Sequence, residues 1–171
     1  MNYKEELIKS MDFLANDSRT VFLGQGVLFP GHAMYETLKQ ISECQRMELP
    51  VVEDLQLGMS IGLSLSGYIP ISIFPRMDFM MCCMNQLVNH LDKVEEMSQG
   101  QYKPFVIIRT MIGSANPLDP GPQHKGDYTE AFRLLTSKVE VLKLRIPEDI
   151  FKSYKWVYEQ RRSAILIEMQ Q

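Results

Sequence analysis

Glu53 is the residue of this 171-residue sequence whose type and position best suit proton chemistry. It stands where the apolar run of residues 49–52 ends and a helical pattern begins, and Asp54 follows it. One interpretation is a helix-start carboxylate that the helix dipole stabilises. The other is a carboxyl that its apolar neighbours, Leu55 among them, desolvate until it can hold a proton near neutral pH. The spacing by itself leaves both interpretations open.

His124 is the second candidate, in the segment Pro-Gly-Pro-Gln-His-Lys. It lies in a Pro- and Gly-rich stretch, residues 111–125, which has no periodicity and is expected to form a long loop. Loops of this length in compact domains are usually functional or disordered. A single loop histidine is nevertheless more often a surface residue than a catalyst. His32 and His90 lie within helical patterns and are interpreted as ordinary helix residues.

Other kinds of chemistry find less support. Gly24 and Gly26 fit the first two positions of a dinucleotide-binding glycine pattern, but Phe29 occupies the third, so a tight turn is favoured. The sequence contains no P-loop motif. Cys82 and Cys83 lie on a predicted helix without a basic residue one turn away, and are interpreted as small buried apolar residues.

Composition excludes several classes of protein. The 18 basic and 21 acidic residues give a net charge of −3, which argues against binding nucleic acid because phosphate neutralisation needs clustered Lys and Arg. The 3 cysteines, an odd number with two adjacent, argue against a secreted disulfide framework and favour a cytoplasmic location. The charged start lacks a signal-peptide pattern, and no apolar run approaches about 18 residues, so we expect no membrane span.

The elements that must position Glu53 and His124 alternate between strand and helix. An amphipathic N-terminal helix is expected within residues 1–17, followed by an α/β core over residues 18–171. Apolar runs predict strands at residues 20–24, 49–52, 68–74, 104–110, 139–144 and 164–169. Helical patterns cover residues 30–45, 53–67, 76–100, 127–135 and 147–161. We therefore expect a doubly wound α/β fold, its mostly parallel sheet covered by helices on both faces, with a ligand beyond the carboxyl ends of the strands.

Several spaced motifs together resemble the pyrimidine-binding domain of thiamine diphosphate enzymes. They are Leu-Pro-Val-Val-Glu-Asp at residues 49–54, Met-Asp-Phe at 77–79, Asn-Gln-Leu-Val-Asn at 85–89 and Gly-Pro-Gln-His at 121–124. The likeness runs from about residue 21 to residue 168 and is greatest to the beta subunit of the pyruvate and branched-chain 2-oxo acid dehydrogenases, with transketolase more distant. It implies a thiamine diphosphate-binding fold, with residues 1–171 as a single pyrimidine-binding domain.

The resemblance implies roles for particular residues. Glu53, with Gly58 five residues later, would contact N1′ of the aminopyrimidine and promote the imino tautomer that removes the thiazolium C2 proton. Leu55 would contribute to the cofactor site, and Phe79 would stack on the pyrimidine. His124 would assist proton transfers near the thiazolium and the acyl acceptor. Arg109 and the 85–89 segment match the family as structural or interface residues.

The sequence departs from the family at positions that bear on the substrate. Gln25 stands where the family has an acidic residue, and Arg76 replaces an aromatic residue that often precedes the stacking Phe79. Lys125 and Gly126 stand where Ser and Gln usually follow the histidine. The donor therefore stays open between a 2-oxo acid and a ketose phosphate. The acceptor stays open between a lipoyl group, a carrier-bound thiol and an aldehyde.

The resemblance also implies a partner. In the family, Mg²⁺ and the diphosphate are held by a Gly-Asp-Gly motif with a downstream Asn, and no Gly-Asp-Gly occurs in this sequence. A second, alpha-like polypeptide would then hold Mg²⁺ and the diphosphate, with active sites at the interfaces of an α2β2 heterotetramer. The family's beta subunits continue into a further domain after the strand that matches residues 164–169, and we expect this chain to lack it.

The leading hypothesis is thus a beta-like subunit, active only with its partner chain. It would cleave a carbon–carbon bond next to a carbonyl of a small keto substrate and pass a two-carbon or acyl unit to an acceptor. A carrier protein is one of the acceptors considered. The alternatives are a transketolase-type subunit, a noncatalytic scaffold or regulatory subunit with the same fold, and a nucleotide-binding Rossmann protein. The failed glycine spacing disfavours the last of these.

Overall fold

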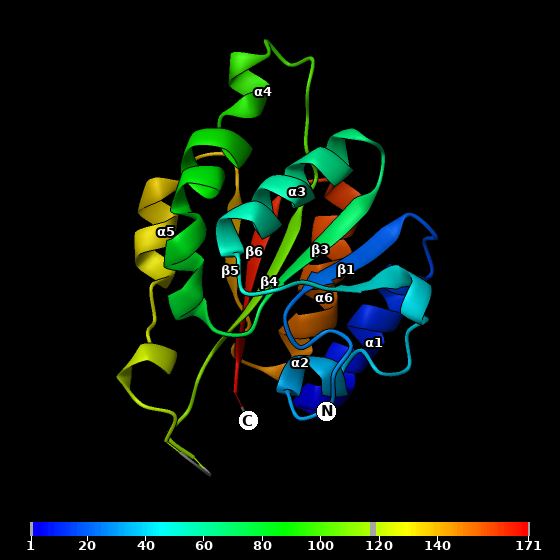
Figure 1. Cartoon of the computed structure of the whole chain (residues 1–171), viewed down its shortest axis with the longest axis vertical. Helices are drawn as coiled ribbons and strands as arrows, with labels where there is room; N and C mark the ends of the chain where they lie inside the picture. Colours follow the sequence, from blue (N-terminus) through cyan, green and yellow to red (C-terminus); the bar gives the residue numbers. More distant parts are fainter. Residues whose placement is uncertain (1, 117–118, 171) are drawn as a thin grey trace.

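The strands of the chain form one parallel sheet, seen in the computed structural model, which describes residues 2–116 and 119–170 (Figure 1). In spatial order the strands are β2 (Arg46–Glu48), β1 (Thr20–Gly24), β3 (Ile69–Phe74), β4 (Ile107–Ile112), β6 (Ala164–Met169) and β5 (Glu140–Lys143). Every pair of neighbouring strands is parallel. The expected α/β fold with a parallel sheet is confirmed.

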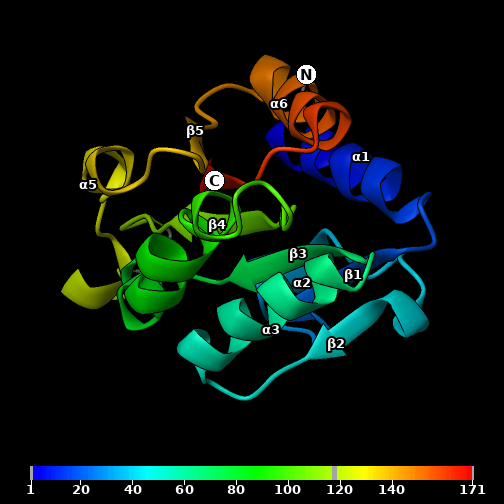
Figure 2. The same cartoon turned by 90° about the horizontal axis from the view of Figure 1, so that it is seen from above.

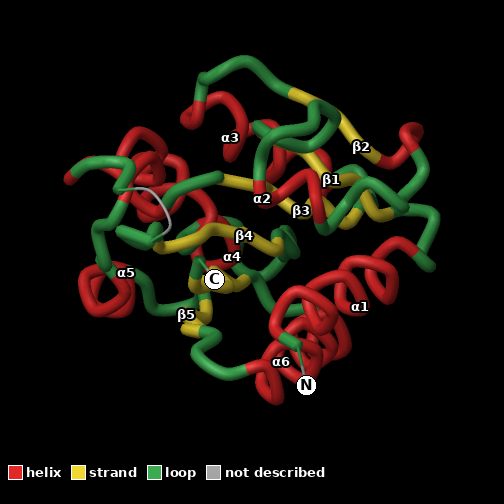
Figure 3. The backbone as a smooth tube through the Cα atoms, turned by 90° about the horizontal axis from the view of Figure 1, so that it is seen from below, coloured by secondary structure: helices red, strands yellow, loops and turns green. Residues whose placement is uncertain are grey.

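Helices cover both faces of this sheet (Figure 2). On one face, α1 (Tyr3–Ala15) packs beside α6 (Pro147–Gln160), which Figure 3 shows from the opposite side. The other face carries α3 (Glu53–Leu65), the 3₁₀ helix η2 (Met77–Cys83), the π-helix η3 (Asn85–Leu91) and α5 (Thr129–Leu135). The short elements are α2 (Ala33–Glu36), α4 (Val94–Met97), η1 (Glu43–Gln45) and η4 (Pro122–His124). No helix of the described residues is long and apolar enough to cross a membrane.

The central strands are buried on both faces because each face packs against its own helical layer. All six residues of β3 and of β4 are buried. Since successive side chains of a strand point to opposite faces, Ile71 and Ile73 enter the core beneath α1 and α6, whereas Phe74 enters the core beneath α3 and η2. Continuous apolar strands are what a sheet covered on both sides requires.

Residues 49–52, predicted as the second strand, do not form one. The second strand is β2, immediately before them, and its pairing with β1 runs only as far as Gly24 and Glu48. Beyond that point only the Leu49 amide still bonds to β1, at the Gly24 carbonyl. Val51 is 74% exposed, so this apolar run is a connection that crosses the edge of the sheet.

The helix predicted over residues 30–45 is also wrong, because only α2 and η1 form there. The Thr37 hydroxyl donates to the carbonyl of Met34, a local bond that competes with continued helix. Met34, Leu38 and Ile41, which recur at helical spacing, are nevertheless buried. Cys44, which continues the same spacing, is exposed, so the periodicity identified three buried residues but neither the fourth nor the continuity of the helix.

The single helix predicted over residues 76–100 is instead divided into η2, η3 and α4. Met77, Met80 and Leu87 are buried, and Cys83 is fully buried. Cys82 is exposed, which contradicts its interpretation as a buried residue, because the adjacent Cys83 occupies the side of η2 that faces the core. The helical segment is interrupted at Asp92, whose carboxylate accepts a hydrogen bond from the backbone amide of Lys138.

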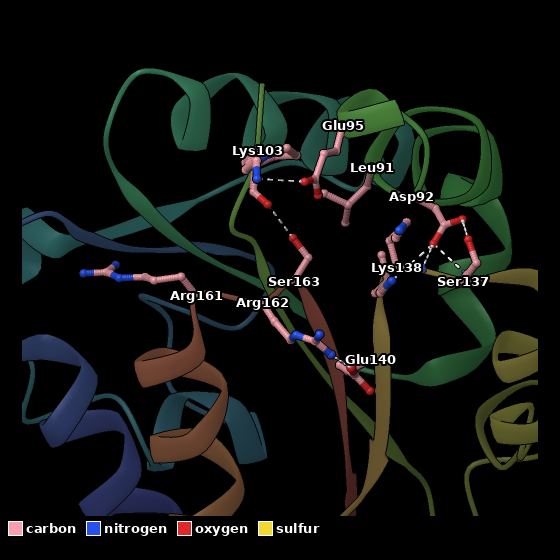
Figure 4. Close-up of a pocket in the computed structure, with 12 residues that line it drawn as sticks. Leu91, Asp92, Glu95, Lys103, Ser137, Lys138, Glu140, Arg161, Arg162 and Ser163 are labelled. Atoms are coloured by element: carbon pink, nitrogen blue, oxygen red, sulfur yellow. Dashed lines mark hydrogen bonds and ion pairs between the residues drawn. The ribbon is translucent and has the colours of Figure 1, made fainter. Parts of the chain in front are cut away.

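Asp92 anchors the end of η3 to the start of β5 (Figure 4). Its carboxylate accepts hydrogen bonds from the backbone amides of Ser137 (2.8 Å), Lys138 (2.6 Å) and Val139 (3.2 Å), and Lys93 Nζ lies 3.0 Å away. Burial by itself would raise the pKa of Asp92, but these hydrogen bonds outweigh it and lower the pKa to about 2.

We predict that Asp92→Asn lowers the free energy of unfolding by about 2 kcal/mol at pH 7. Because the folded pKa lies below the ordinary value of 3.8, the stabilisation from ionised Asp92 is fully present above pH 4 to 5 and is lost as the pH falls toward 2. Urea unfolding at pH 7, 4, 3 and 2 should therefore give a wild-type to variant difference that shrinks with acid. A difference that stayed constant over this range would contradict the assignment.

Candidate functional site

A cavity of about 330 Å³ opens at the carboxyl ends of β1 and β3. The chain leaves β1 to form β2 on one side of it and then crosses to form β3 on the other, so the strand order reverses between β1 and β3. Such reversal points are where doubly wound sheets bind their ligands. The lining residues are Gln25, His32, Val51, Glu53, Pro75, Arg76, Phe79 and His124.

Three of the residues singled out by the sequence thus lie around one cavity. Glu53 reaches it from the start of α3, Phe79 from η2 and His124 from η4. Leu55, expected in the cofactor site, is 62% exposed and is not among the lining residues. The predicted loop over residues 111–125 is irregular from Gly113 onward apart from η4, and its residues 117–118 lie outside the described part of the chain.

Gln56, one helical turn after Glu53, fixes the direction in which the Glu53 side chain points. Gln56 is fully buried, and its Nε2 donates to the Ser72 hydroxyl (3.1 Å) and the Ile73 carbonyl (2.9 Å) of β3. Residues three apart share a helix face, so this attachment turns Glu53 toward the edge of the sheet. Glu53 is 7% exposed, and we find no hydrogen-bond donor to its carboxyl among the described residues. Its oxygens are available to a ligand.

Gly24 gives Gln56 the space that this attachment needs. It ends β1 with a φ of +142°, and a Cβ there would lie 2.1 Å from the Ile73 carbonyl oxygen and 2.9 Å from Gln56 Nε2. A larger residue would therefore collide with the backbone of β3 and displace the Gln56 amide from the Ile73 carbonyl. Gln25 continues the network, since its Nε2 donates to Gln56 Oε1 (2.8 Å) and to the Pro50 carbonyl (3.0 Å).

Glu48 holds the loop that follows β1, a role that the sequence did not indicate. Its carboxylate accepts hydrogen bonds from the amides of Gly26 (2.8 Å), Val27 (2.6 Å) and Leu28 (2.8 Å). Three successive amides directed at one carboxylate fix the backbone beside Gln25. An acidic residue at the end of a three-residue edge strand forms no recognisable motif, so only the structure reveals this contact.

His32 also lines the cavity, contrary to its interpretation as an ordinary helix residue. Its Nδ1 accepts the Met34 amide (3.2 Å) and caps α2, so in the neutral ring the proton is on Nε2. Burial lowers the pKa of His32, the charges of Arg76 and Arg109 lower it further, and Glu48 opposes them. His32 is therefore a neutral N–H donor at pH 7.

His124 is held in the wall of the cavity by its backbone and by Phe79. The Gly113 amide donates to the His124 carbonyl (3.1 Å), and a Cβ on Gly113 would lie 2.1 Å from that oxygen. The rings of Phe79 and His124 meet edge to face, with centroids 5.4 Å apart at 86°. His124 Nδ1 is buried and has no hydrogen-bond partner among the described residues.

Arg76 brings a positive charge to the cavity. Its Nη1 donates to the neighbouring Pro75 carbonyl (3.0 Å), whereas its buried Nε has no partner among the described groups. Burial lowers the pKa of Arg76, and Asp78 opposes this effect. Gln25 and Arg76, two of the four departures from the family pattern, thus line the same cavity as Glu53.

Arg109, matched to the family as a structural or interface residue, lies away from this cavity in a buried ion pair. Its Nε is 2.6 Å from Glu168 Oε1, and its Nη2 donates to the Thr37 hydroxyl (2.8 Å). Tyr154 donates to the same Glu168 oxygen (2.7 Å). This cluster links β4, β6 and α6 beneath the carboxyl edge of the sheet.

A larger cavity of about 440 Å³ lies at the amino ends of β5 and β6 (Figure 4). Its charged groups are largely paired with one another, Lys103 with Glu95 at 3.1 Å and Arg162 with Glu140. Outside this cavity, the buried thiol of Cys83 is also unsuited to act as a nucleophile, because burial raises its pKa to about 12. The cavity between β1 and β3 is therefore the better candidate site.

We predict that Glu48→Gln lowers the free energy of unfolding by about 1–2 kcal/mol and loosens residues 26–28, because an amide NH₂ would then face backbone N–H groups. Hydrogen exchange of the Gly26, Val27 and Leu28 amides should become faster. Glu43→Gln is the matched control, since the Glu43 side chain is 87% exposed. Unchanged exchange at these three amides would show that Glu48 does not hold the loop.

With this geometry established, comparisons with known proteins identify relatives of the chain. No protein-family model matches it. It is 26% identical over 147 residues to the beta subunit of 3-methyl-2-oxobutanoate dehydrogenase from Mycobacterium tuberculosis, covering 82% of this chain and 40% of that protein. It is 26% identical over 117 residues to the beta subunit of 2-oxoisovalerate dehydrogenase from Bacillus subtilis, covering 66% of this chain and 36% of that protein.

Two further comparisons agree with these. The beta subunit of the pyruvate dehydrogenase E1 component from Mycoplasma pneumoniae is 24% identical over 152 residues, which cover 86% of this chain and 45% of that subunit. Among solved structures, an inactive beta4 tetramer of a split-gene transketolase matches with a TM-score of 0.71 and 16% identity, over 97% of this chain and 50% of that one. The chain thus spans less than half of the length of the beta subunits it matches.

Proposed function

We propose that this chain, a relative of the beta subunits of 2-oxo acid dehydrogenases with a transketolase-like fold, forms the pyrimidine-binding half of a thiamine diphosphate site. The observation that carries the proposal is the Glu53 carboxyl. It is buried, has no hydrogen-bond donor among the described residues, and lies in the cavity where β1 and β3 end.

The residues around Glu53 suit a flat aromatic amine. Apolar surface comes from Val51, Pro75 and Phe79. Glu53 supplies a carboxyl group that can share a proton with a ring nitrogen. A volume of about 330 Å³ lies near the lower end of the range for small-molecule sites. The cavity is thus suited in size and chemistry to the aminopyrimidine part of the cofactor.

In this site Glu53 would hold a proton at the ring nitrogen, in a setting where burial strengthens the shared hydrogen bond. Phe79 would fix the plane of the ring, and His124 would move a proton beside the reacting carbonyl. When bound, thiamine diphosphate supplies the electron sink that allows a carbon–carbon bond next to a carbonyl to break. The chain's own contribution is orientation, exclusion of water and proton placement.

The remaining parts of the site belong to the proposed partner. We assign Mg²⁺ and the diphosphate to an alpha-like subunit in an α2β2 assembly, following the implied division of the family's site between two halves. The donor would be a small 2-oxo acid or ketose phosphate, and the acceptor a lipoyl group, another carrier-bound thiol or an aldehyde. The location consistent with its cysteine usage is the cytoplasm.

We predict that Glu53→Gln, in the chain co-purified with its alpha-like subunit, lowers cofactor-dependent turnover by about 10²–10⁴-fold, as expected for loss of one positioned proton donor. Asp54→Asn is the matched control, because Asp54 is exposed in the same first turn of α3. Steady-state turnover of 2-oxo acids and ketose phosphates by the two variants and wild type is the measurement. Full activity of the Gln variant would refute the role of Glu53.

Thermal unfolding of the same complex separates an enzyme from a scaffold. A cofactor present at 100 times its Kd stabilises the folded state by about 2.7 kcal/mol. Thiamine diphosphate with Mg²⁺ should therefore raise the unfolding temperature of the wild-type complex, and do so less for Glu53→Gln. A wild-type complex that shows no such rise would be a scaffold or regulatory subunit.

A further inference from the structure

Arg76 is a cation without a counterion in the wall of the candidate site. Among the described residues it forms no ion pair within 4.0 Å, and its only hydrogen bond is the one from Nη1 to the adjacent Pro75 carbonyl. Gly113 leaves room for it, since a Cβ there would lie 3.4 Å from Arg76 Nε. A guanidinium stays charged in proteins, so the cavity contains a positive charge that no carboxylate of the described residues contacts.

The acidic groups near Arg76, Asp78 and Glu53, form no ion pair with it. The Asp78 carboxylate accepts the Gly126 amide (3.2 and 3.3 Å) and the Tyr128 hydroxyl (3.5 Å), which bind the loop before α5. Glu53 lines the same cavity but forms no ion pair with Arg76. Leaving a half-buried charge unpaired is costly, and a bound anion would remove that cost.

The other polar groups of the cavity also suit an anion. His32 presents a neutral ring whose proton is on Nε2, and the buried Nδ1 of His124 has no partner among the described residues. Gln25 contributes a side-chain amide. The site therefore combines one acid, Glu53, with one permanent cation and two imidazoles. Such a combination suits a ligand pair in which one member is a base and the other an anion.

We propose that Arg76 forms an anion-binding subsite of this cavity that holds the carboxylate or phosphate group of the donor substrate. The planar guanidinium offers parallel N–H donors that match two oxygens of either group. Only the identification of the anion as the donor substrate rests on the proposed function. The anion site itself follows from the unpaired charge and the geometry of the cavity.

The first test measures anion binding to the purified chain without cofactor. Titration calorimetry with pyruvate, with inorganic phosphate and with fructose 6-phosphate, in a chloride background of fixed ionic strength, should give measurable binding of at least one of them. Arg76→Gln should weaken it by about 10–100-fold, and Arg76→Lys by less than Arg76→Gln. Arg145→Gln, which removes an exposed charge, is the control and should bind as wild type does.

The three ligands distinguish the two sources of the anion. Preference for pyruvate assigns the subsite to a carboxylate, and preference for the two phosphates assigns it to a phosphate. Absence of binding to all three, or equal loss in the Arg145 and Arg76 variants, would overturn the proposal. Circular dichroism and thermal unfolding of Arg76→Gln and Arg76→Lys exclude misfolding as the cause of any loss.

The second test uses the complex with its partner and thiamine diphosphate. Arg76→Gln should raise KM for the donor by about 10–100-fold, with a change in kcat of less than about threefold, and leave the Kd of thiamine diphosphate unchanged. Parallel losses in cofactor Kd would show that Arg76 serves the cofactor, which contradicts the proposal. If the cofactor fails to bind while Arg76-dependent anion binding persists, the proposed function fails and the anion site stands.

Discussion

The position of the Glu53 carboxyl depends on one buried amide, that of Gln56. A helix that packs on a sheet can rotate about its axis unless something fixes it, and here two hydrogen bonds to β3 do so. The attachment is possible only because β1 ends in Gly24, whose missing side chain lets Gln56 approach the Ile73 carbonyl. One side-chain amide therefore joins β1, β3 and α3 at the point where the cavity opens.

The same junction explains how the cavity acquires its mixture of charges. Glu48 and Gln25 fix the loops on the β1 side, where Glu53 enters, while the turn after β3 delivers Arg76 and then Phe79. An acid and a cation thus reach one small space from different elements without pairing with each other. Their separation leaves both free for ligands, whereas a direct ion pair would have closed the site.

Much of the fold follows from local sequence patterns. The strands β1, β3, β5 and β6 and the helices α1, α3 and α6 lie where apolar runs and helical spacing placed them, because these patterns reflect burial on one or both faces. The strand prediction for residues 49–52 was wrong because an apolar run that does not pair with a neighbouring strand forms only a connection. The prediction of a continuous helix over residues 30–45 was wrong because the Thr37 hydroxyl forms a local hydrogen bond that favours a turn.

The site was predictable only in part, for a similar reason. Glu53, Phe79 and His124 belong to spaced motifs, and their gathering follows from the reversal of strand order. The residues that support the walls of the site, Gln56, Glu48 and Gly113, act through contacts that no local pattern encodes. His32 was missed because its ring caps a helix of only one turn.

The central claim is that the cavity between β1 and β3 holds an aromatic amine ring against Glu53. A crystal structure of the chain with its alpha-like subunit and thiamine diphosphate tests this most directly. We expect the aminopyrimidine to lie against Phe79, with a ring nitrogen about 3 Å from a Glu53 carboxyl oxygen. A cofactor bound in this complex with its ring outside the cavity, and with Glu53 contacting no part of it, would contradict the account.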